Sequence, residues 1–235
     1  MSEIRTELDS LIRLATPHQG DVLLDVGTGG GTTAAAFAGL VKRVVAVDIS
    51  ESALADAEKL FHALRLSNVE TIALDATKIT LPGNSFDIVT FRYAAHHVAD
   101  MRTALSEIYR VVSPHGRLVI EDKIAPSRRI HDLFTNELGT LRDSTYVRAY
   151  TEREWKQLVR EAGFFSPYVE TFREEKDVEA WLAGSMLRSS QKKRIREHLL
   201  NAPQSTREYF AMRFDGDRVI ALTEDRIRLR AIKTG

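Results

Sequence analysis

The sequence predicts an α/β protein with a doubly wound, mostly parallel sheet, and three observations support this class. Short apolar runs that are typical of buried strands recur along the first half of the chain, at a spacing of roughly 20–30 residues that fits βα units. Segments with helical periodicity separate these runs. A glycine-rich stretch follows the first run, at the point where a strand of such a sheet turns into a helix.

The alternation of strands and helices covers the chain up to residue 122. An amphipathic helix is expected over residues 3–15, because apolar residues recur there at helical spacing. Buried strands are expected at 21–26, 43–47, 69–74, 86–91 and 117–120. Three helices are expected: one at 32–40, one that begins after Ser50 as its N-cap, and one at 101–112. A turn is expected at 81–84. Elements in this order form a parallel sheet with helices on its faces.

The pattern changes after residue 122. Helices are expected at 130–141 and 152–162, the second ending at Gly163, and a charged helical stretch at 177–202. Strands are expected at 168–172 and 227–232, and a hairpin through Asp215-Gly216-Asp217 joins 210–214 to 218–222. We therefore expect a single domain, 1–235, in which residues 1–125 bind a cofactor and residues 126–235 supply the last strands and helices that cover the substrate.

The composition excludes several classes of protein. The 235 residues include 33 basic and 33 acidic side chains, so nothing resembles the electrostatic footprint of a nucleic-acid or membrane-surface protein. The sequence contains no cysteine, which excludes disulfides, thiolate catalysis and cysteine-bound metal. It shows neither a long apolar run nor a signal-peptide pattern. We expect a cytoplasmic monomer or homodimer whose partner is a small molecule.

Acidic residues end three of the expected strands. Asp25 precedes the glycines at positions 27, 29, 30 and 31, and Asp48 and Asp75 end the next two apolar runs. Because the carboxyl ends of parallel strands meet at one edge of the sheet, the three carboxylates are expected to line one crevice. Glycine tolerates a positive φ and lets a ligand approach the backbone. The sequence therefore predicts a nucleotide-sized site at this edge.

Two kinds of nucleotide compete for this site. Gly29, Gly31 and Ala34 satisfy the dinucleotide pattern G-x-G-x-x-A, although the pattern fails when it is started from Gly27, because Thr32 then occupies its third position. A carboxylate at Asp25 would repel a pyrophosphate but would suit an ammonium group. The acids favour an adenosine with a cationic amino-acid tail, as in S-adenosylmethionine. A nicotinamide-dependent oxidoreductase and a non-catalytic adenosyl-binding module remain the alternatives.

The segment Asp25-x-Gly27-x-Gly29-x-Gly31 resembles motif I of the class I S-adenosylmethionine-dependent methyltransferases. Residues 81–98 and 110–118 resemble the fourth-strand region, and the helix, turn and strand after it, of the small-molecule branch related to the ubiquinone/menaquinone C-methyltransferases. The resemblance implies a Rossmann-like sheet of seven strands with an antiparallel last strand, for which 227–232 is the candidate. It also implies methyl transfer to a small organic acceptor, with S-adenosylhomocysteine as product.

The resemblance further implies a role for individual residues. The loop of Gly27, Thr28, Gly29 and Gly31 would line the cofactor, with Asp25 near its amino group. Asp48 would hold the ribose hydroxyls, and Ile49 would pack on the adenine. Asp75 would meet the adenine amino group, to which Ala76 adds a backbone N–H. Arg92 would border the methionine part, and His97 would lie near the cofactor.

Candidate catalytic residues follow the fourth strand. Methyl transfer from a sulfonium needs alignment, a dry pocket and sometimes a base. His96 and His97 are candidates for that base because histidine titrates near neutral pH, and Tyr93 is a further candidate. The alternative for either histidine is a capping or packing role. His96 is expected nearer the substrate.

Other polar residues give weaker signals. No metal is expected, because His96, His97, His115, His131, Glu121 and Asp122 have the spacing of no familiar ligand set. Arg142 or Arg148 would either pair with an anionic group of the substrate or form salt bridges. The basic run 191–196 is interpreted as a solvated helix face rather than a nucleic-acid site. The acceptor and the methylated atom stay open.

Overall fold

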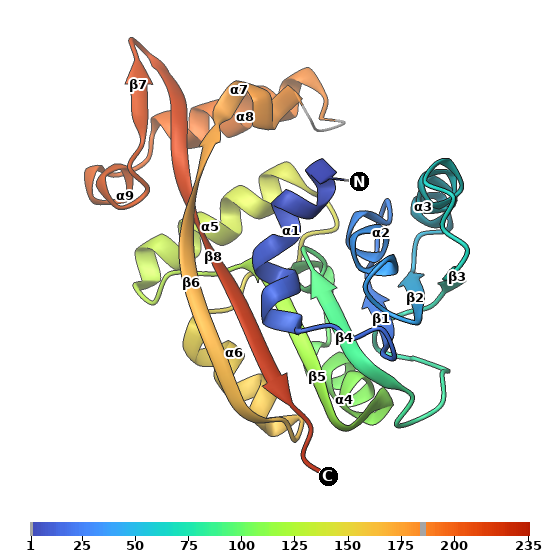
Figure 1. Ribbon diagram of the computed structural model, residues 1–235. Helices are drawn as coiled ribbons and strands as arrows, with labels where there is room; N and C mark the ends of the chain where they lie inside the picture. The colour runs from blue at the N-terminus through green and yellow to red at the C-terminus, as the bar shows by residue number, and fades with distance from the viewer. Residues whose placement is uncertain (1, 184–186) are drawn as a thin grey trace. The chain divides into compact units, whose positions relative to one another are not determined.

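The computed structural model of the protein describes residues 2–183 and 187–235 (Figure 1). Its strands are β1 (Val22–Val26), β2 (Arg43–Asp48), β3 (Val69–Ala73), β4 (Phe86–Arg92), β5 (Val112–Lys123), β6 (Phe165–Asp177), β7 (Arg213–Asp215) and β8 (Arg218–Ile232). Its helices are α1 (Ser2–Ala15), α2 (Thr32–Ala38), α3 (Glu51–Ala63), η1 (Ala95–His97), α4 (Met101–Val111), α5 (Arg129–Arg142), α6 (Glu152–Glu161), α7 (Val178–Ala183), α8 (Ser189–Leu200) and α9 (Gln204–Tyr209).

The first five strands form a parallel sheet, as the sequence predicts. Strand β1 pairs in parallel with β2 on one side and β4 on the other, β2 pairs with β3, and β4 pairs with β5. All five strands are parallel, but in the order β3-β2-β1-β4-β5 the direction in which successive strands are added across the sheet reverses between β1 and β4. In open α/β sheets, ligands bind outside the carboxyl ends of the strands at such a reversal. The glycine-rich loop lies at this point, because it follows β1.

The far end of the sheet is antiparallel. The strand path continues from β5 through β8 to β6, and β7 pairs with β8 off this path. Within the described residues the sheet therefore has eight strands, one more than the resemblance implies. The N–H of Ile124 donates to the carbonyl of Asp225, and the N–H of Lys233 donates to the carbonyl of Gly116. Residue numbers therefore increase along β5 while the numbers of the facing residues of β8 decrease, so these two strands are antiparallel. The prediction of a doubly wound sheet with an antiparallel last strand is confirmed.

Two predicted strands are in fact one. The expected strands 218–222 and 227–232 are joined in β8, which runs without a break from Arg218 to Ile232. The sequence between them, Thr223-Glu224-Asp225-Arg226, is polar enough to suggest a turn. In the structure the charges are paired within the strand, with Arg226 Nη2 2.7 Å from Glu224 Oε2. Pairing offsets the cost of burying them, and the strand continues.

Other elements of the second half differ from their predicted extents. The helical stretch expected at 177–202 divides into α7 and α8, and residues 184–186 of that stretch lie outside the described residues. Helix α9 was not predicted, since its six residues are too few to show a periodic pattern. Strand β6 is longer than the expected 168–172. The hairpin around Asp215-Gly216-Asp217 is confirmed, with β7 antiparallel to β8.

The chain divides into two compact units. Unit 1 comprises the chain up to Asp122 with Arg153–Glu170 and Arg228–Gly235, and unit 2 comprises Lys123–Glu152 and Thr171–Ile227. One buried cluster of unit 1 packs α1 and α2 against the sheet through Leu8, Leu11, Phe37, Leu23 and Val44. The main cluster of unit 2 gathers Phe134, Leu138, Ile195, Leu199 and Phe210. Burying each such side chain contributes about 1.5–3 kcal/mol to folding.

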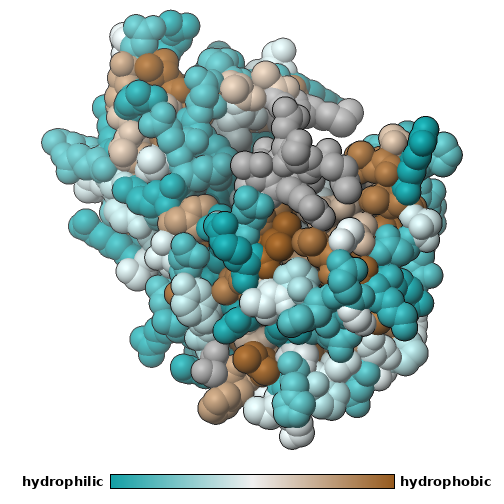
Figure 2. Space-filling view, in the orientation of Figure 1, coloured by the Kyte–Doolittle hydropathy of each residue, from teal (hydrophilic) through white to brown (hydrophobic). Residues whose placement is uncertain are grey.

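The face of the molecule that is seen in Figure 1 is mainly polar. Figure 2 shows that hydrophilic residues dominate the face seen in Figure 1, with hydrophobic residues gathered in a few patches. Among the described residues, no helix has the length and apolar character needed to span a bilayer.

Candidate functional site

The glycine loop between β1 and α2 has three glycines with positive φ, and two of them are also required by packing. A Cβ on Gly27, at φ +64°, would lie 2.3 Å from the Cβ of Ala94. A Cβ on Gly31, at φ +80°, would lie 2.6 Å from the ring of Phe61. Gly29 differs, because a Cβ there would meet no atom within 4 Å despite its φ of +53°. Space for a ligand therefore adjoins the loop at Gly29.

Asp48 is held at the end of β2 by two backbone amides. The N–H of Gly29 donates to its Oδ2 at 2.8 Å, and the N–H of Ser50 donates to its Oδ1 at 2.9 Å. The N–H of Thr28 donates to the carbonyl of Val47, which ties the loop to the same strand. The loop and the carboxylate thus share one fixed geometry. Beside them, Ile49 is 73 % exposed, which leaves an apolar side chain in contact with solvent.

Asp25 lies beneath the loop. Its side chain is 1 % exposed and accepts hydrogen bonds of 2.7 Å from the hydroxyls of Thr28 and Thr90. Burial raises the pKa of Asp25 to about 6, although the two hydroxyls and the charge of Arg92 oppose this shift. Sequence reasoning missed Thr90. Thr90 can be identified only when the parallel register of β1 and β4 is known, because that register places Thr90 opposite Asp25.

Asp75 and Ala76 follow β3. The Asp75 side chain is exposed and accepts hydrogen bonds of 2.8 Å from the backbone N–H and the hydroxyl of Thr77. This is a local Asx turn that fixes the direction of the carboxylate. The parallel pairing of β2 with β3 puts Asp75 at the same edge of the sheet as Asp48.

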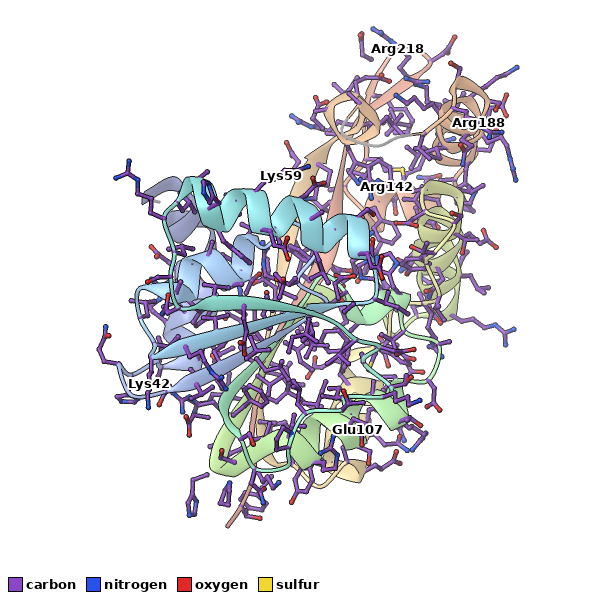
Figure 3. All side chains as sticks on the ribbon, turned by 90° about the vertical axis from the view of Figure 1, so that its right-hand side faces the viewer. Lys42, Lys59, Glu107, Arg142, Arg188 and Arg218 are labelled. Atoms are coloured by element: carbon purple, nitrogen blue, oxygen red, sulfur yellow. The ribbon has the colours of Figure 1, made fainter. Side chains whose placement is uncertain are left out.

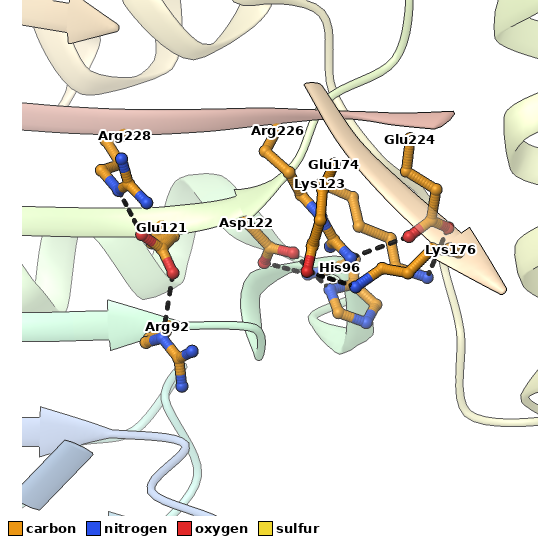
Figure 4. Close-up of polar contacts among 10 residues, drawn as sticks. All are labelled: Arg92, His96, Glu121, Asp122, Lys123, Glu174, Lys176, Glu224, Arg226 and Arg228. Carbon is orange, nitrogen blue, oxygen red and sulfur yellow. Dashed lines mark hydrogen bonds and ion pairs between the residues drawn. The ribbon is translucent and has the colours of Figure 1, made fainter. Parts of the chain in front are cut away.

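The end of β4 carries Arg92, which belongs to a buried ion cluster. Arg92 Nε donates to Glu121 Oε1 at 3.0 Å, and Arg228 pairs with the other carboxylate oxygen (Figure 4). Glu121 is 2 % exposed, so two guanidinium groups neutralise a buried carboxylate. The Arg92 guanidinium also lies 4.3 Å from the ring centroid of Tyr93. Tyr93 has a φ of +52°, a conformation that costs about 1–2 kcal/mol for a residue with a Cβ.

His96 is buried beside Asp122. Its Nδ1 lies 2.6 Å from Asp122 Oδ1, and its backbone N–H donates to Oδ2 at 3.2 Å (Figure 4). The His97 ring lies 4.1 Å from the His96 ring, measured between centroids. Asp122 as the partner of His96 was missed by sequence reasoning. The signal was present in the acidic pair that ends β5, because β5 is the parallel neighbour of the strand that precedes His96.

The weaker candidates lie in unit 2. The Arg142 guanidinium lies 4.7 Å from the ring of Trp181, and that of Arg148 lies 4.6 Å from the ring of Tyr150. Both arginines therefore lie over aromatic rings in a cation–π geometry. Among the described residues, no three His, Asp or Glu side chains gather as a metal site.

The comparisons with known proteins agree with this geometry. Residues 24–120 match a family model described as a methyltransferase domain. The chain is 30 % identical over 206 residues to the uncharacterized methyltransferase YcgJ of Bacillus subtilis, across 88 % of this chain and 81 % of that protein. It is 36 % identical over 138 residues to a demethylmenaquinone methyltransferase of Clavibacter sepedonicus, across 54 % of each.

Solved structures show the same relationship over almost the whole chain. The crystal structure of YcgJ covers 98 % of this chain and 99 % of its own, with a TM-score of 0.94 and 28 % identity. A putative methyltransferase from Bacillus halodurans covers 98 % of this chain and 100 % of its own, with a TM-score of 0.93 and 30 % identity. The fold, the glycine loop at the strand reversal and these relatives lead to one conclusion: the chain belongs to the S-adenosylmethionine-dependent methyltransferases.

Proposed function

We propose that the protein methylates a small organic acceptor, and that the loop of residues 27–31 with Asp48 and Ile49 holds the methyl donor. One observation supports the site above the others. The Asp48 carboxylate is fixed by the N–H groups of Gly29 and Ser50, beside an exposed Ile49 and the open face of Gly29. A carboxylate suits a ribose diol, and an exposed apolar side chain suits the face of a purine.

The remaining cofactor contacts follow from position at the sheet edge. Asp75, fixed by its turn, would accept from the adenine amino group, and the backbone N–H of Ala76 would donate to the ring. Arg92 and His97 would border the methionine part, together with Thr28 and the backbone of Gly27 and Gly31. Asp25 would act from beneath the loop. It would orient Thr28, and its negative charge would favour the amino group of the methyl donor. S-adenosylmethionine supplies a methyl group on a sulfonium that is already a good leaving group.

His96 is the proposed general base. A carboxylate can only accept hydrogen bonds, so Asp122 favours the tautomer of His96 with the proton on Nδ1. The neutral ring then carries its lone pair on Nε2, which can take a proton from the acceptor. Tyr93 and His97 are the proposed neighbours that shape the pocket. C-, O- and N-methylation all fit this scheme.

Turnover tests this proposal. The wild-type protein is supplied with S-adenosylmethionine carrying a labelled methyl group and a panel of small phenols, amines and acidic carbon compounds, and product is detected by mass spectrometry. We expect product with at least one class and a loss of about 10²–10⁴-fold in kcat for His96→Ala, the usual contribution of a general base. His97→Ala is the matched variant and should retain more activity. Cofactor binding without product across the panel would instead identify a non-catalytic adenosyl-binding module.

We further propose that the protein works in the cytoplasm as a monomer or homodimer, as one domain in which residues 1–125 bind cofactor and 126–235 cover the acceptor. The balanced charge supports a small-molecule partner rather than a nucleic acid. Light scattering on purified protein gives the oligomeric state, and a trimer or larger assembly would contradict this part.

A further inference from the structure

The guanidinium group of Arg92 is held through a single nitrogen. Its Nε donates to Glu121 Oε1 at 3.0 Å, and its central carbon lies 4.3 Å from the centroid of the Tyr93 ring. No hydrogen bond or ion pair joins Nη1 or Nη2 to another of the described residues. Figure 4 shows that these two nitrogens point away from Glu121. Most of the N–H donors of Arg92 therefore remain available for an acceptor.

Arg92 is far less exposed than an ordinary surface cation. Arg218, which is labelled in Figure 3, is of the ordinary kind, because its side chain is 69 % exposed and pairs with Asp215. The side chain of Arg92 is only 16 % exposed. Taking a guanidinium out of water is costly unless its donors find acceptors. The two Nη groups of Arg92 are therefore expected to face an acceptor when the site is occupied.

The charge of Arg92 is not matched by the carboxylates around it. Glu121 is shared, because Arg228 pairs with its other oxygen. Arg228 has a second carboxylate, since its Nη1 lies 4.0 Å from Glu170 Oε2, whereas none pairs in this way with Arg92 within the described part of the chain. The charge of Arg92 lowers the pKa of Asp25 against the larger effect of burial, but the Asp25 oxygens accept from two threonine hydroxyls instead. The excess of positive charge favours an anionic acceptor.

Arg92 lies beside the loop that is proposed to hold the methyl donor. Strands β1 and β4 pair in parallel, with Val26 opposite Phe91. The next residues along the two strands are Gly27, the first residue of the loop, and Arg92. The loop approaches the end of β4 so closely that a Cβ on Gly27 would lie 2.3 Å from the Cβ of Ala94. Arg92 is therefore a neighbour of the donor site within unit 1.

We propose that Nη1 and Nη2 of Arg92 bind the carboxylate of the methyl donor's amino-acid tail, and that Glu121 and Arg228 are positioning residues that fix the guanidinium for this contact. This inference rests on the proposed donor site. A guanidinium matches a carboxylate in shape as well as in charge, because two parallel N–H donors meet two oxygens. Glu121 holds Arg92 at Nε, and Arg228 occupies the second oxygen of Glu121. The carboxylate of Glu121 is thereby kept from turning to the Nη atoms, which stay open for the donor.

Three ligands that differ in their tails test the contact. S-adenosylhomocysteine carries the whole tail, its decarboxylated analogue lacks only the carboxylate, and 5′-methylthioadenosine keeps only a methyl group on the sulfur. Calorimetry on the full-length protein gives the affinity for each. We expect wild type to bind S-adenosylhomocysteine at least about tenfold more tightly than the decarboxylated analogue, as for a charge-assisted contact at two points. Equal affinities of wild type for these two ligands overturn the inference.

Variants of Arg92 assign this preference to its guanidinium. In Arg92→Gln the affinity for S-adenosylhomocysteine should fall at least about tenfold, whereas the affinity for the decarboxylated analogue should change by less than about twofold. Arg92→Lys keeps the charge but loses the fork of donors, so it should retain a preference of about threefold. Arg43→Gln is the matched control, because the Arg43–Glu70 pair is about half exposed. An equal loss of affinity for both ligands in Arg92→Gln overturns the inference.

The positioning residues are tested by the same ratio of affinities, which a purely structural role would not change. Arg228→Gln lets the Glu121 carboxylate turn toward the Nη atoms, so the preference for S-adenosylhomocysteine should fall at least about threefold while the affinity for 5′-methylthioadenosine stays the same. Glu121→Gln removes the anchor of Arg92 and should lower the ratio as well. If Glu121→Gln folds poorly, Arg228→Gln decides, because the Arg92–Glu121 pair remains in it. An unchanged ratio in folded Arg228→Gln overturns the positioning role.

Failure of this inference and failure of the proposed donor site give different results. Binding of 5′-methylthioadenosine depends on the adenosine part of the site alone. If it binds and wild type shows no preference between the other two ligands, only the carboxylate contact is rejected. If none of the three ligands binds to folded wild-type protein, the donor site is rejected, and the inference with it.

Discussion

Asp122 holds His96 at two points, since its carboxylate lies 2.6 Å from the ring Nδ1 and accepts from the backbone N–H. Both residues are buried, with Asp122 0 % exposed and His96 8 % exposed. The pair joins the end of β5 to the 3-10 turn η1 after β4. The ring orientation therefore depends on the sheet itself and not on a surface loop.

Asp122→Asn is expected to change the tautomer of His96. The amide can donate as well as accept, so the preference for a proton on Nδ1 weakens. The ¹⁵N chemical shifts of the His96 ring measure this directly. Stability should also fall by about 1–3 kcal/mol, the cost of disturbing a buried hydrogen bond to a charged group. Asp56→Asn, at an exposed site, is the control. Identical ring shifts in wild type and Asp122→Asn would show that the carboxylate does not set the tautomer.

Two glycines of the loop should respond differently to alanine. Gly27→Ala places a Cβ against Ala94 in a left-handed conformation, so we expect a loss of about 2–4 kcal/mol in the free energy of unfolding. Gly29→Ala adds only the conformational cost, about 1 kcal/mol, because the space beside it is open. Its larger effect should be on S-adenosylhomocysteine affinity. Urea unfolding and calorimetry separate the two effects, and equal destabilisation by both changes would contradict this assignment.

The buried Asp25 should make stability depend on pH. Its pKa is raised from 3.8 to about 6 in the folded protein, so the folded state binds this proton more tightly than the unfolded chain. The resulting stabilisation is complete below about pH 4 and is lost as the pH rises through about 6, by an amount on the order of 3 kcal/mol. Asp25→Asn has no such proton. The unfolding free energy of the wild type should therefore fall relative to that of Asp25→Asn as the pH rises from 4 to 7. A difference that is constant over this range would contradict the raised pKa.

Glu121→Gln should be strongly destabilising. The change leaves Arg92 and Arg228 without the carboxylate between them, and breaking a buried ion pair costs about 3–5 kcal/mol. Glu70→Gln is the matched control, because the Arg43–Glu70 pair is about half exposed and such pairs contribute at most about 1 kcal/mol. Chemical unfolding of both variants gives the comparison. A similar small loss in both would mean that the buried cluster does not stabilise the sheet.

The first half of the fold could be predicted because most residues of β1, β2 and β4 are buried, and because α3 and α4 carry their buried apolar residues at helical spacing. Ser50 as N-cap is one example, since its side chain accepts from the N–H of Ala53 in the structure. The polar interior of β8 could not be predicted, because Glu224 and Arg226 look like a loop until their partners are known. A pattern along the chain shows burial, but it does not show which charges meet across strands.

The candidate site likewise has one part that the sequence predicts and another that it does not. Glycines and strand-end acids mark the position of the loop, because these residue types are needed locally. The orienting partners Thr90 and Asp122 come from neighbouring strands, and only the sheet register brings them to Asp25 and His96. The open edge of Arg92 depends on how Glu121 and Arg228 meet it across neighbouring strands, for which the sequence has no local signal.

Calorimetric titration with S-adenosylhomocysteine tests the central claim most directly. Wild type should bind it, and Asp48→Asn should bind at least about tenfold more weakly, because the carboxylate that we propose accepts from the ribose is replaced by an amide. Asp56→Asn should bind like wild type. No binding to folded wild-type protein, or equal affinity in wild type and Asp48→Asn, would contradict the account.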